Sequence, residues 1–482
     1  MKKNGAFRRV AALMAALSIT VSLAAPAFAE TYYYIDDGDI TITKDEYGKQ
    51  TVQQGSNAAE KIGDDEEIII TTHKKAITSL ESDLEGPAAE DSGFGPVVED
   101  NYQPVQPEDA EEPEGADQPK DAEEPEGADQ PKDAEEPKDA DQPENTDRQE
   151  SAGQQAQPQQ AAPTAAAPAA PTSGNKKENG FWGNTITVIN NFADKVLNLT
   201  LKDVKINARG TGSNIYPNFE DGKAALSVQG QGDVEIELDG DNELKSGFNR
   251  AGLEKNTSDS TGTLTLKDDN KDGSLRAEGG SGGAGIGGGS GDGSGDGDGE
   301  NITIKGGRVT AVGNKFGAGI GGSNGGSGKH ITITGGEVTA TGGDYGAGIG
   351  GGYYGSGEHI TITGGTVNAV GDGHGAGIGG GAEGSGQNIK ITGGTVNASG
   401  WAGAGIGGGV DGSGSNVTVS GAAQVTVTAS KSSDWDSADT GATIGNGGSV
   451  TEDGDLVNGE EIQADISGLT TGYICLLYTS PS

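Results

Sequence analysis

From residue 279 to about residue 450 the chain consists of short runs of apolar and polar residues that are separated by pairs of glycine. A Gly-Ala-Gly-Ile run begins at residues 283, 317, 346, 375 and 403, with a degenerate copy at 441. The second strand-like run of each unit begins at Asn301, His330, His359, Asn388 and Asn416, which gives a core spacing of 29 residues. A fixed period of this length predicts a solenoid.

Each repeat contains three strand-length runs, namely Gly-Ala-Gly-Ile, Ile-Thr-Ile-Thr and x-Val-Thr/Asn-Ala. Glycine pairs separate the runs, as corners with positive φ require. Three strands and three corners predict an all-β fold, a right-handed parallel β-helix with three sides and ~29 residues per coil. Stacking of the coils places equivalent residues of neighbouring coils above one another, about 4.8 Å apart. The predicted inward ladders are Ile286, Ile320, Ile349, Ile378 and Ile406; Ile304, Ile333, Ile362, Ile391 and Val419; and Val309, Val338, Val367 and Val396.

The chain before the regular repeats (279–450) divides into further segments. Residues 181–278 contain short alternating runs broken by Gly, Asn or Asp, and they predict irregular β-helix coils. Residues 30–82 hold two strand-like runs, at 39–43 and 66–72, and predict a short β segment.

Between these segments, residues 83–180 predict a long disordered linker, acidic and rich in Pro, Ala and Gln. A 12-residue unit at 109–120 recurs at 121–132. Its carboxylates repel one another, so folding this segment would not offset the conformational entropy that is lost when a chain becomes ordered. From residue 81 to 150 there are 26 Asp and Glu against 4 Lys and Arg. This excess argues against nucleic acid or an anionic membrane as a partner.

The two ends of the chain contain segments that we expect not to belong to the mature folded protein. Residues 1–29 have a basic start, an apolar stretch and an Ala-Phe-Ala cleavage site, which predicts a signal peptide and a mature start at Glu30. No later segment is apolar enough to span a bilayer. Residues 475–482 resemble the translation of a sequencing-library adapter, so residues 451–474 are interpreted as the start of a truncated C-terminal region. We therefore expect a secreted, extracellular or cell-wall-associated protein, and wall attachment through the missing C-terminus is left open.

Aromatic residues give the sharpest functional signal. The residue before Gly-Ala-Gly-Ile is an aromatic ring in successive copies, one more ring lies a position further back in the fourth copy, and two lie on the next corner. Stacked coils would align these rings along one edge, where rings suit the faces of sugars. The alternative is that the rings only support one another at the corner. The predicted carbohydrate-binding residues are Phe316, Tyr345, Tyr353, Tyr354, His374 and Trp401.

Two acidic loops offer candidate calcium ligands. Asp268, Asn270 and Asp272 alternate before a glycine, as oxygen ligands do in a calcium loop. Carboxylates also crowd the longer loop of the first copy. Hairpin turns rich in Asp, Asn and Gly explain both loops equally well. The candidate ligands in the longer loop are Asp292, Asp296 and Asp298. No cofactor is expected to be required, and Ca2+ is left open.

Catalysis finds little support in the sequence. Gly-x-Gly-x-x-Gly recurs without a following helix, whereas a dinucleotide site needs it once before a helix. No Ser/His/Asp set is evident, and no residue is assigned a catalytic role. We therefore expect that this protein is not an enzyme. Polysaccharide lyases and hydrolases do use parallel β-helices, so that alternative stays open, because a fold alone does not decide function.

The run Gly-Ala-Gly-Ile-Gly-Gly-Gly, followed by Ile-Thr-Ile-Thr-Gly-Gly-Thr-Val-Asn-Ala, resembles glycine-rich β-helix surface proteins of Gram-positive gut bacteria, of the carbohydrate-binding domain-containing type. The lead-in at 199–206 and 234–244 is also similar to that family. The resemblance implies a parallel β-helix that binds plant or host polysaccharide. It places no family site residue by residue.

These observations predict a secreted or cell-surface β-solenoid that binds polysaccharide or a cell-surface glycan without cleaving it. A structural surface protein or protein-binding adhesin is the alternative, and a polysaccharide lyase or hydrolase is a minor one.

Overall fold

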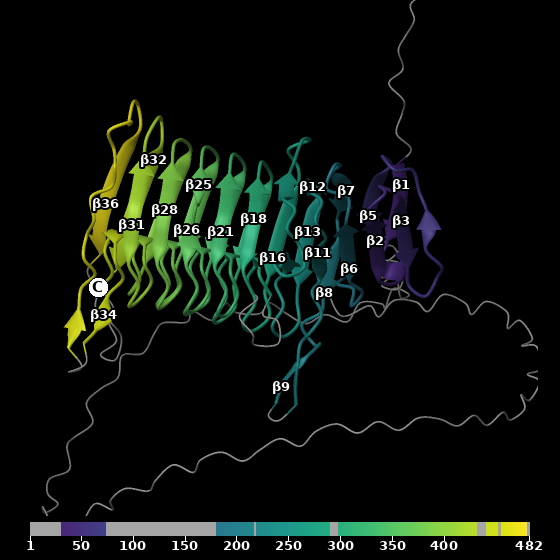
Figure 1. Ribbon diagram of the computed structural model, residues 1–482, viewed down its shortest axis with the longest axis horizontal. Coiled ribbons are helices and arrows are strands. Elements are labelled where there is room, and N and C mark those ends of the chain that lie inside the picture. Colours follow the sequence, from purple (N-terminus) through teal and green to yellow (C-terminus); the bar gives the residue numbers. More distant parts are fainter. Residues whose placement is uncertain are drawn as a thin grey trace, which may run out of the picture. The chain divides into compact units, whose positions relative to one another are not determined.

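The computed structural model describes residues 30–73, 180–215, 218–289, 297–430, 440–451 and 455–479. The predicted signal peptide and nearly all of the predicted linker lie outside these residues. Among the described residues, three sheets of mainly parallel strands run along successive coils, and this arrangement confirms the predicted parallel β-helix (Figure 1). No helix of the described segments is long and apolar enough to cross a membrane.

The first sheet contains, in spatial order, β1 (Glu30–Tyr34), β5 (Glu67–Thr71), β7 (Leu197–Lys202), β12 (Val234–Asp239), β15 (Leu264–Lys267), β18 (Gly299–Ile304), β21 (Gly328–Ile333), β24 (Gly357–Glu358) beside β25 (Thr361–Ile362), β28 (Gly386–Ile391) and β31 (Gly414–Val419). The second sheet contains β4 (Glu60–Lys61), β3 (Gln50–Gln54), β2 (Ile40–Lys44), β6 (Ile186–Asn190), β11 (Leu226–Gln229), β14 (Leu253–Glu254), β17 (Ile286–Gly287), β20 (Ile320–Gly321), β23 (Ile349–Gly350), β27 (Ile378–Gly379), β30 (Ile406–Gly407) and β33 (Ile444–Gly445).

The third sheet contains β8 (Lys205–Asn207), β13 (Asp241–Lys245), β16 (Ser274–Glu278), β19 (Arg308–Val312), β22 (Glu337–Thr341), β26 (Thr366–Val370), β29 (Thr395–Gly400), β32 (Gln424–Ser430) and β36 (Tyr473–Thr479). Two small antiparallel pairs, β9 (Ser213–Ile215) with β10 (Asn218–Glu220) and β34 (Ser449–Val450) with β35 (Leu456–Val457), and the 3-10 helix η1 (Ile35–Asp37) complete the described elements.

The core is a narrow column of like residues, as the repeat predicts. In the second sheet Ile349 pairs with Ile320 on one side and with Ile378 on the other, and all three are fully buried. The registers of the other two sheets align the remaining predicted ladders in the same way, from Ile304 to Val419 and from Val309 to Val396. The predicted ladders are confirmed, because every coil presents the same inward residues to its neighbours.

The corners require glycine for two reasons: a side chain would clash with the next coil, and the backbone has a positive φ. Gly350 has a φ of 136°, and a Cβ placed on it would lie 1.9 Å from the carbonyl oxygen of Gly379 in the next coil. At another corner the chain uses Asn or His in the left-handed region, with φ of 53° at His330 and 54° at His359. The rings of these two histidines stack with centroids 5.1 Å apart.

Residues 30–73 form the first strands of the same β-helix. β2 pairs in parallel with β6, which aligns Ile40 with Ile186, and β5 pairs in parallel with β7. β3 and β4 add an antiparallel extension to the second sheet beyond β2. Residues 74–179 therefore connect β5 of the first sheet to β6 of the second sheet within one folded unit, and β7, which follows β6, pairs with β5.

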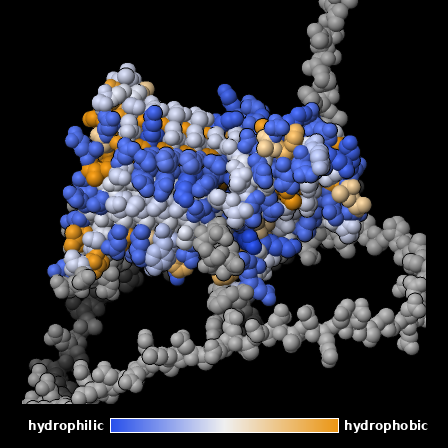
Figure 2. Space-filling model, viewed as in Figure 1, coloured by the Kyte–Doolittle hydropathy of each residue, from blue (hydrophilic) through white to orange (hydrophobic). Residues whose placement is uncertain are grey.

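At the other end, β36 pairs in parallel with β32 along its whole length and extends the third sheet. This strand includes most of the segment that the sequence analysis interprets as an adapter. Its side chains are poorly covered: Tyr478 is 61% exposed, and hydrophobic residues reach the surface at this end of the β-helix (Figure 2).

Candidate functional site

Three of the predicted rings form a stacked column at the corner before the second sheet. The register of the Gly-Ala-Gly-Ile strands places Phe316, Tyr345 and His374 level with one another in successive coils. The ring centroids of Phe316 and Tyr345 are 5.4 Å apart with planes 26° apart, and those of Tyr345 and His374 are 4.8 Å apart with planes 12° apart. By the same register the column lies between Gly282 and Ala402, which carry no ring.

The next corner adds two rings to this column. The Tyr353 ring lies 5.7 Å from the Phe316 ring and 5.1 Å from the Tyr345 ring, and the Tyr353 amide donates to the carbonyl of Phe316 (2.8 Å). Tyr345 and Tyr353 also pack against a small buried cluster of Ala382, Ala402 and Val410. Tyr354 follows with its centroid 3.9 Å from that of Tyr353. The column is therefore anchored from two corners at once.

This stacking decides which ring surfaces reach solvent. Phe316, Tyr345, Tyr353 and His374 are each half-buried and turn faces toward one another, so they present mainly edges. Tyr354 is 57% exposed and has only Tyr353 against it. Mutual support therefore accounts for the inner rings, and an open face is found at the rim of the column.

Trp401 is placed differently from the other predicted rings. Its coil is one residue shorter than the preceding ones, so Ala402 rather than Trp401 falls level with His374. Trp401 is half-buried, and no ring among the described residues stacks on it. The structure therefore brings five of the six predicted rings together, and among the described residues Trp401 is a separate ring.

A short chain of hydroxyl groups runs along the rim. The Tyr353 hydroxyl lies 2.8 Å from the Tyr354 hydroxyl and donates to Glu383 Oε1 at 3.2 Å. The hydrogen bond with Tyr354, burial and the nearby carboxylate of Glu383 raise the pKa of the Tyr353 phenol. The phenol therefore stays neutral and keeps its proton for donation. Phenols and a carboxylate beside open ring faces offer both the apolar and the polar contacts that a sugar uses.

Two side-chain oxygens of the first candidate calcium loop accept hydrogen bonds within the turn. Asp268 Oδ1 accepts from the Lys271 amide (2.7 Å), and Asn270 Oδ1 accepts from the Asp272 amide (3.3 Å). Lys271 has a φ of 67°, as a tight turn requires. The loop is a tight turn at the corner between β15 of the first sheet and β16 of the third sheet, and not a hairpin, because these strands do not pair. Calcium binding here stays a prediction.

In the second candidate loop, Asp292 and Asp296 lie outside the described residues. Asp298 is described, and it makes an ion pair with Lys329 at 2.8 Å and accepts from the Ser327 amide at 2.6 Å. An ion would have to displace that ammonium group to use the Asp298 carboxylate.

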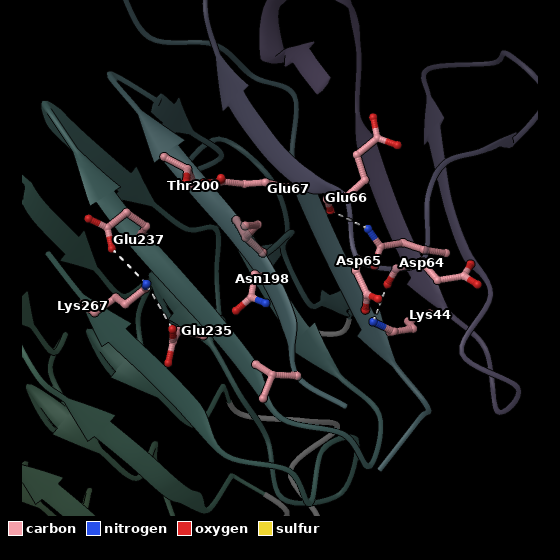
Figure 3. A pocket seen from close by; sticks show the side chains of 13 residues that line it. Lys44, Asp64, Asp65, Glu66, Glu67, Asn198, Thr200, Glu235, Glu237 and Lys267 are labelled. Atoms are coloured by element: carbon pink, nitrogen blue, oxygen red, sulfur yellow. Dashed lines mark hydrogen bonds and ion pairs between the residues drawn. The ribbon is translucent and has the colours of Figure 1, made fainter. Parts of the chain in front are cut away.

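A pocket that the sequence analysis does not predict lies on the outer face of the first sheet, with a volume of about 440 Å3 (Figure 3). Glu235 and Glu237 point into it from β12, because residues two apart on a strand share a face. Glu67 of β5 accepts a hydrogen bond from Thr200 of β7 at 2.8 Å. On the far side, the buried Lys44 donates to the carbonyl of Asp64 at 2.9 Å.

Lys267 of β15 lies between the two glutamates of this pocket. Its Nζ is 3.2 Å from Glu235 Oε1 and 3.5 Å from Glu237 Oε2 (Figure 3). Burial acts to raise the pKa of Glu235, but hydrogen bonds from Lys305 and Lys267 together hold it below its ordinary value. Burial raises the pKa of Glu237, whose Oε2 is buried and accepts no hydrogen bond. The surroundings therefore shift the pKa values of the two neighbouring carboxyl groups in opposite directions.

Four segments of the regular coils match the family described as "Beta helix repeat", at residues 302–326, 331–353, 360–382 and 389–410. Three of the matched segments begin within a strand of the first sheet, and the segment 360–382 begins one residue before β25 of that sheet; all four end near the ring-bearing corner or its equivalent. Comparison with curated proteins and with solved structures gave no significant match. The repeat match agrees with the parallel β-helix described above. It carries no information on a ligand, because enzymes and non-enzymes share this fold.

Proposed function

We propose that this protein is a secreted or cell-surface β-helix that binds polysaccharide without cleaving it. The observation that carries the proposal is the column of rings fixed across three coils, with the 57% exposed ring of Tyr354 at its rim. Rings held by their neighbours lose little conformational entropy on binding, which favours association. Tyrosine and tryptophan dominate recognition surfaces because they combine an apolar face with a polar group.

Because the rings stack on one another, only some of the predicted residues are free to contact a sugar. Within the segments that the structure describes, no second ring stacks on Trp401 and only the Tyr353 ring contacts the Tyr354 ring. Glu383 and the tyrosine hydroxyls can pair with sugar hydroxyls. Phe316, Tyr345, Tyr353 and His374 would act mainly as a rigid support. This assignment moves the expected contacts from the whole column to its rim.

The test is binding to a panel of insoluble polysaccharides, with xylan, pectin and mucin glycans included. We expect the double variant Tyr354→Ala with Trp401→Ala to lose at least tenfold in affinity, about 1.4 kcal/mol. Tyr47→Ala is the matched control, because Tyr47 is 82% exposed and lies in the turn between β2 and β3. Equal binding by the double variant, or no binding by the unaltered protein to any member of the panel, would refute the assignment.

Export is part of the proposal. Cleavage before Glu30 would leave β1 whole, because that strand begins at Glu30. N-terminal sequencing of the protein recovered from the culture medium or the cell surface should read Glu-Thr-Tyr-Tyr-Tyr. Recovery of the uncleaved chain in the cytoplasm alone would overturn this part of the proposal.

The acidic pocket supports a second candidate function, the hydrolysis of a polysaccharide. Paired carboxylates whose pKa values are pushed apart are what a hydrolase would need, with Glu237 as acid and Glu235 as base. Lys267 occupies the space between them, however, and favours a structural ion-pair network. Release of reducing ends from pectin or xylan that is abolished in Glu237→Gln would replace the binding proposal by an enzymatic one.

A further inference from the structure

Two segments meet beyond the ends of β1 and β5, at the start of the β-helix. These strands pair in parallel with Tyr34 opposite Thr71, so the residues that follow each strand also come level. Asp36, the second residue after β1, therefore meets His73, the second residue after β5. Asp37 is next to Asp36 in η1. His73 is also the last described residue before the connection to β6.

The side chains of these three residues converge. His73 Nδ1 is 2.8 Å from Asp36 Oδ2 and 3.8 Å from Asp37 Oδ1. One ligand atom from each residue can be chosen so that all of them lie within 4.8 Å of one another, and no other such group of three His, Cys, Asp or Glu occurs in the part of the chain that the structure describes.

The imidazole of His73 is held in place from two sides. The Tyr34 ring stacks on it, with centroids 3.7 Å apart and planes 14° apart. The His73 amide donates to Asp36 Oδ1 at 3.2 Å, which fixes the carboxylate that faces the ring. His73 and Asp37 are nearly half exposed, so an ion can reach them from solvent. The three side chains are therefore held close together where an ion could join them, and a hydrogen bond between His73 and Asp36 is the competing explanation.

We propose that Asp36, Asp37 and His73 bind one divalent transition-metal ion of the Zn2+ type. One imidazole nitrogen and two carboxylate oxygens suit such an ion, and water would complete its coordination. Calcium fits poorly, because it prefers six to eight oxygen ligands. The strongly negative chain, with a formal net charge of −41, attracts cations to its surface. The bound ion would tie the end of β5 to η1 at the point where the chain leaves the β-helix.

The experiment uses the imidazole nitrogens of the full chain as reporters. The chain has four histidines, so each 15N imidazole signal can be assigned by single substitutions. We expect one equivalent of ZnCl2 to shift the Nδ1 signal of His73 and to leave the signals of His330, His359 and His374 unchanged. This readout is insensitive to ions that bind only to the acidic segment between residues 81 and 150.

Two variants separate metal binding from a simple hydrogen bond. Asp37→Asn keeps the contact between His73 and Asp36 but removes one ligand, so we expect Zn2+ affinity to fall tenfold or more. His374→Ala is the control and should bind as the unaltered chain does. The proposal is overturned if Zn2+ leaves the His73 signal in place, if it shifts another histidine instead, or if Asp37→Asn binds equally well.

Discussion

Replacing Lys255 by methionine should stabilise the β-helix at pH 7. Lys255 follows β14 at a position that glycine occupies in the next coil, and its side chain is fully buried. Its amino group donates to the carbonyl of Ser260 at 3.2 Å, and the described residues make no ion pair with it. Methionine has a similar length and flexibility but carries no charge, so it can fill the same space.

The size of the effect follows from the pKa of this lysine. Burial lowers the pKa of Lys255 from its ordinary value of 10.5 to about 8, although Glu300 and Asp233 act against the change. That difference corresponds to a cost of about 3 kcal/mol for keeping the charged group in the folded protein. Loss of the hydrogen bond to Ser260 offsets about 1 kcal/mol. We therefore expect Lys255→Met to gain about 2 kcal/mol in the free energy of unfolding.

The same pKa sets the pH dependence. Below pH 8 the lysine is charged in the folded and the unfolded protein, so the full cost is present. Between about pH 8 and pH 10.5 the folded protein loses the proton first, and the stability of the unaltered protein rises. The advantage of Lys255→Met should therefore be largest at pH 7 and should be lost by pH 10.5, where the missing hydrogen bond to Ser260 makes the variant slightly less stable.

Urea unfolding followed by circular dichroism at pH 7 and at pH 10 measures both effects. The exposed Lys390→Met is the matched control and should change the unfolding midpoint little at either pH. The reasoning fails if Lys255→Met is no more stable at pH 7, or if its advantage is the same at pH 7 and pH 10.

Two further substitutions test the packing of the coils. Ile349→Ala should cost about 3 kcal/mol in urea unfolding, because it opens a cavity in a fully buried ladder; a loss below about 1 kcal/mol would contradict that packing. Gly350→Ala should destabilise far more than Gly180→Ala. Both glycines have positive φ, but the added Cβ would meet the Gly379 carbonyl oxygen at 1.9 Å in the first case and nothing within 4 Å in the second. Similar unfolding midpoints for the two alanine variants would count against this steric account.

The regular coils could be predicted from the sequence because each repeats the same inward residues. Once Ile320, Ile349 and Ile378 are recognised as equivalent, stacking fixes the register, and the structure confirms it. The same logic brings Phe316, Tyr345 and His374 level. It does not give the direction in which the rings turn, and that direction decides which faces are open.

The acidic pocket and the role of residues 30–73 could not be predicted in this way. Glu67 and Thr200 are 133 residues apart, and no repeat relates them. The sequence shows Glu235 and Glu237 alternating with apolar residues on a strand, which predicts a shared outward face. It does not show that β5 lies beside β7, because pairing between irregular coils depends on long-range packing rather than on a period.

The pairing of β5 with β7 determines how the segment between β5 and β6 can change in length and in sequence. Residues 74–179 lie between β5 and β6, and the β7 strand that follows β6 still pairs directly with β5, so the length of this segment does not affect the spacing of the coils. The entropic cost of closing a connection grows with the logarithm of its length, so a connection of that size costs only roughly 1 kcal/mol more to close than one regular coil. The chain after His73 can therefore accept an inserted sequence of almost any length. A foreign domain inserted there would lie next to the first coils, and the register of the ladders in the following coils would not change.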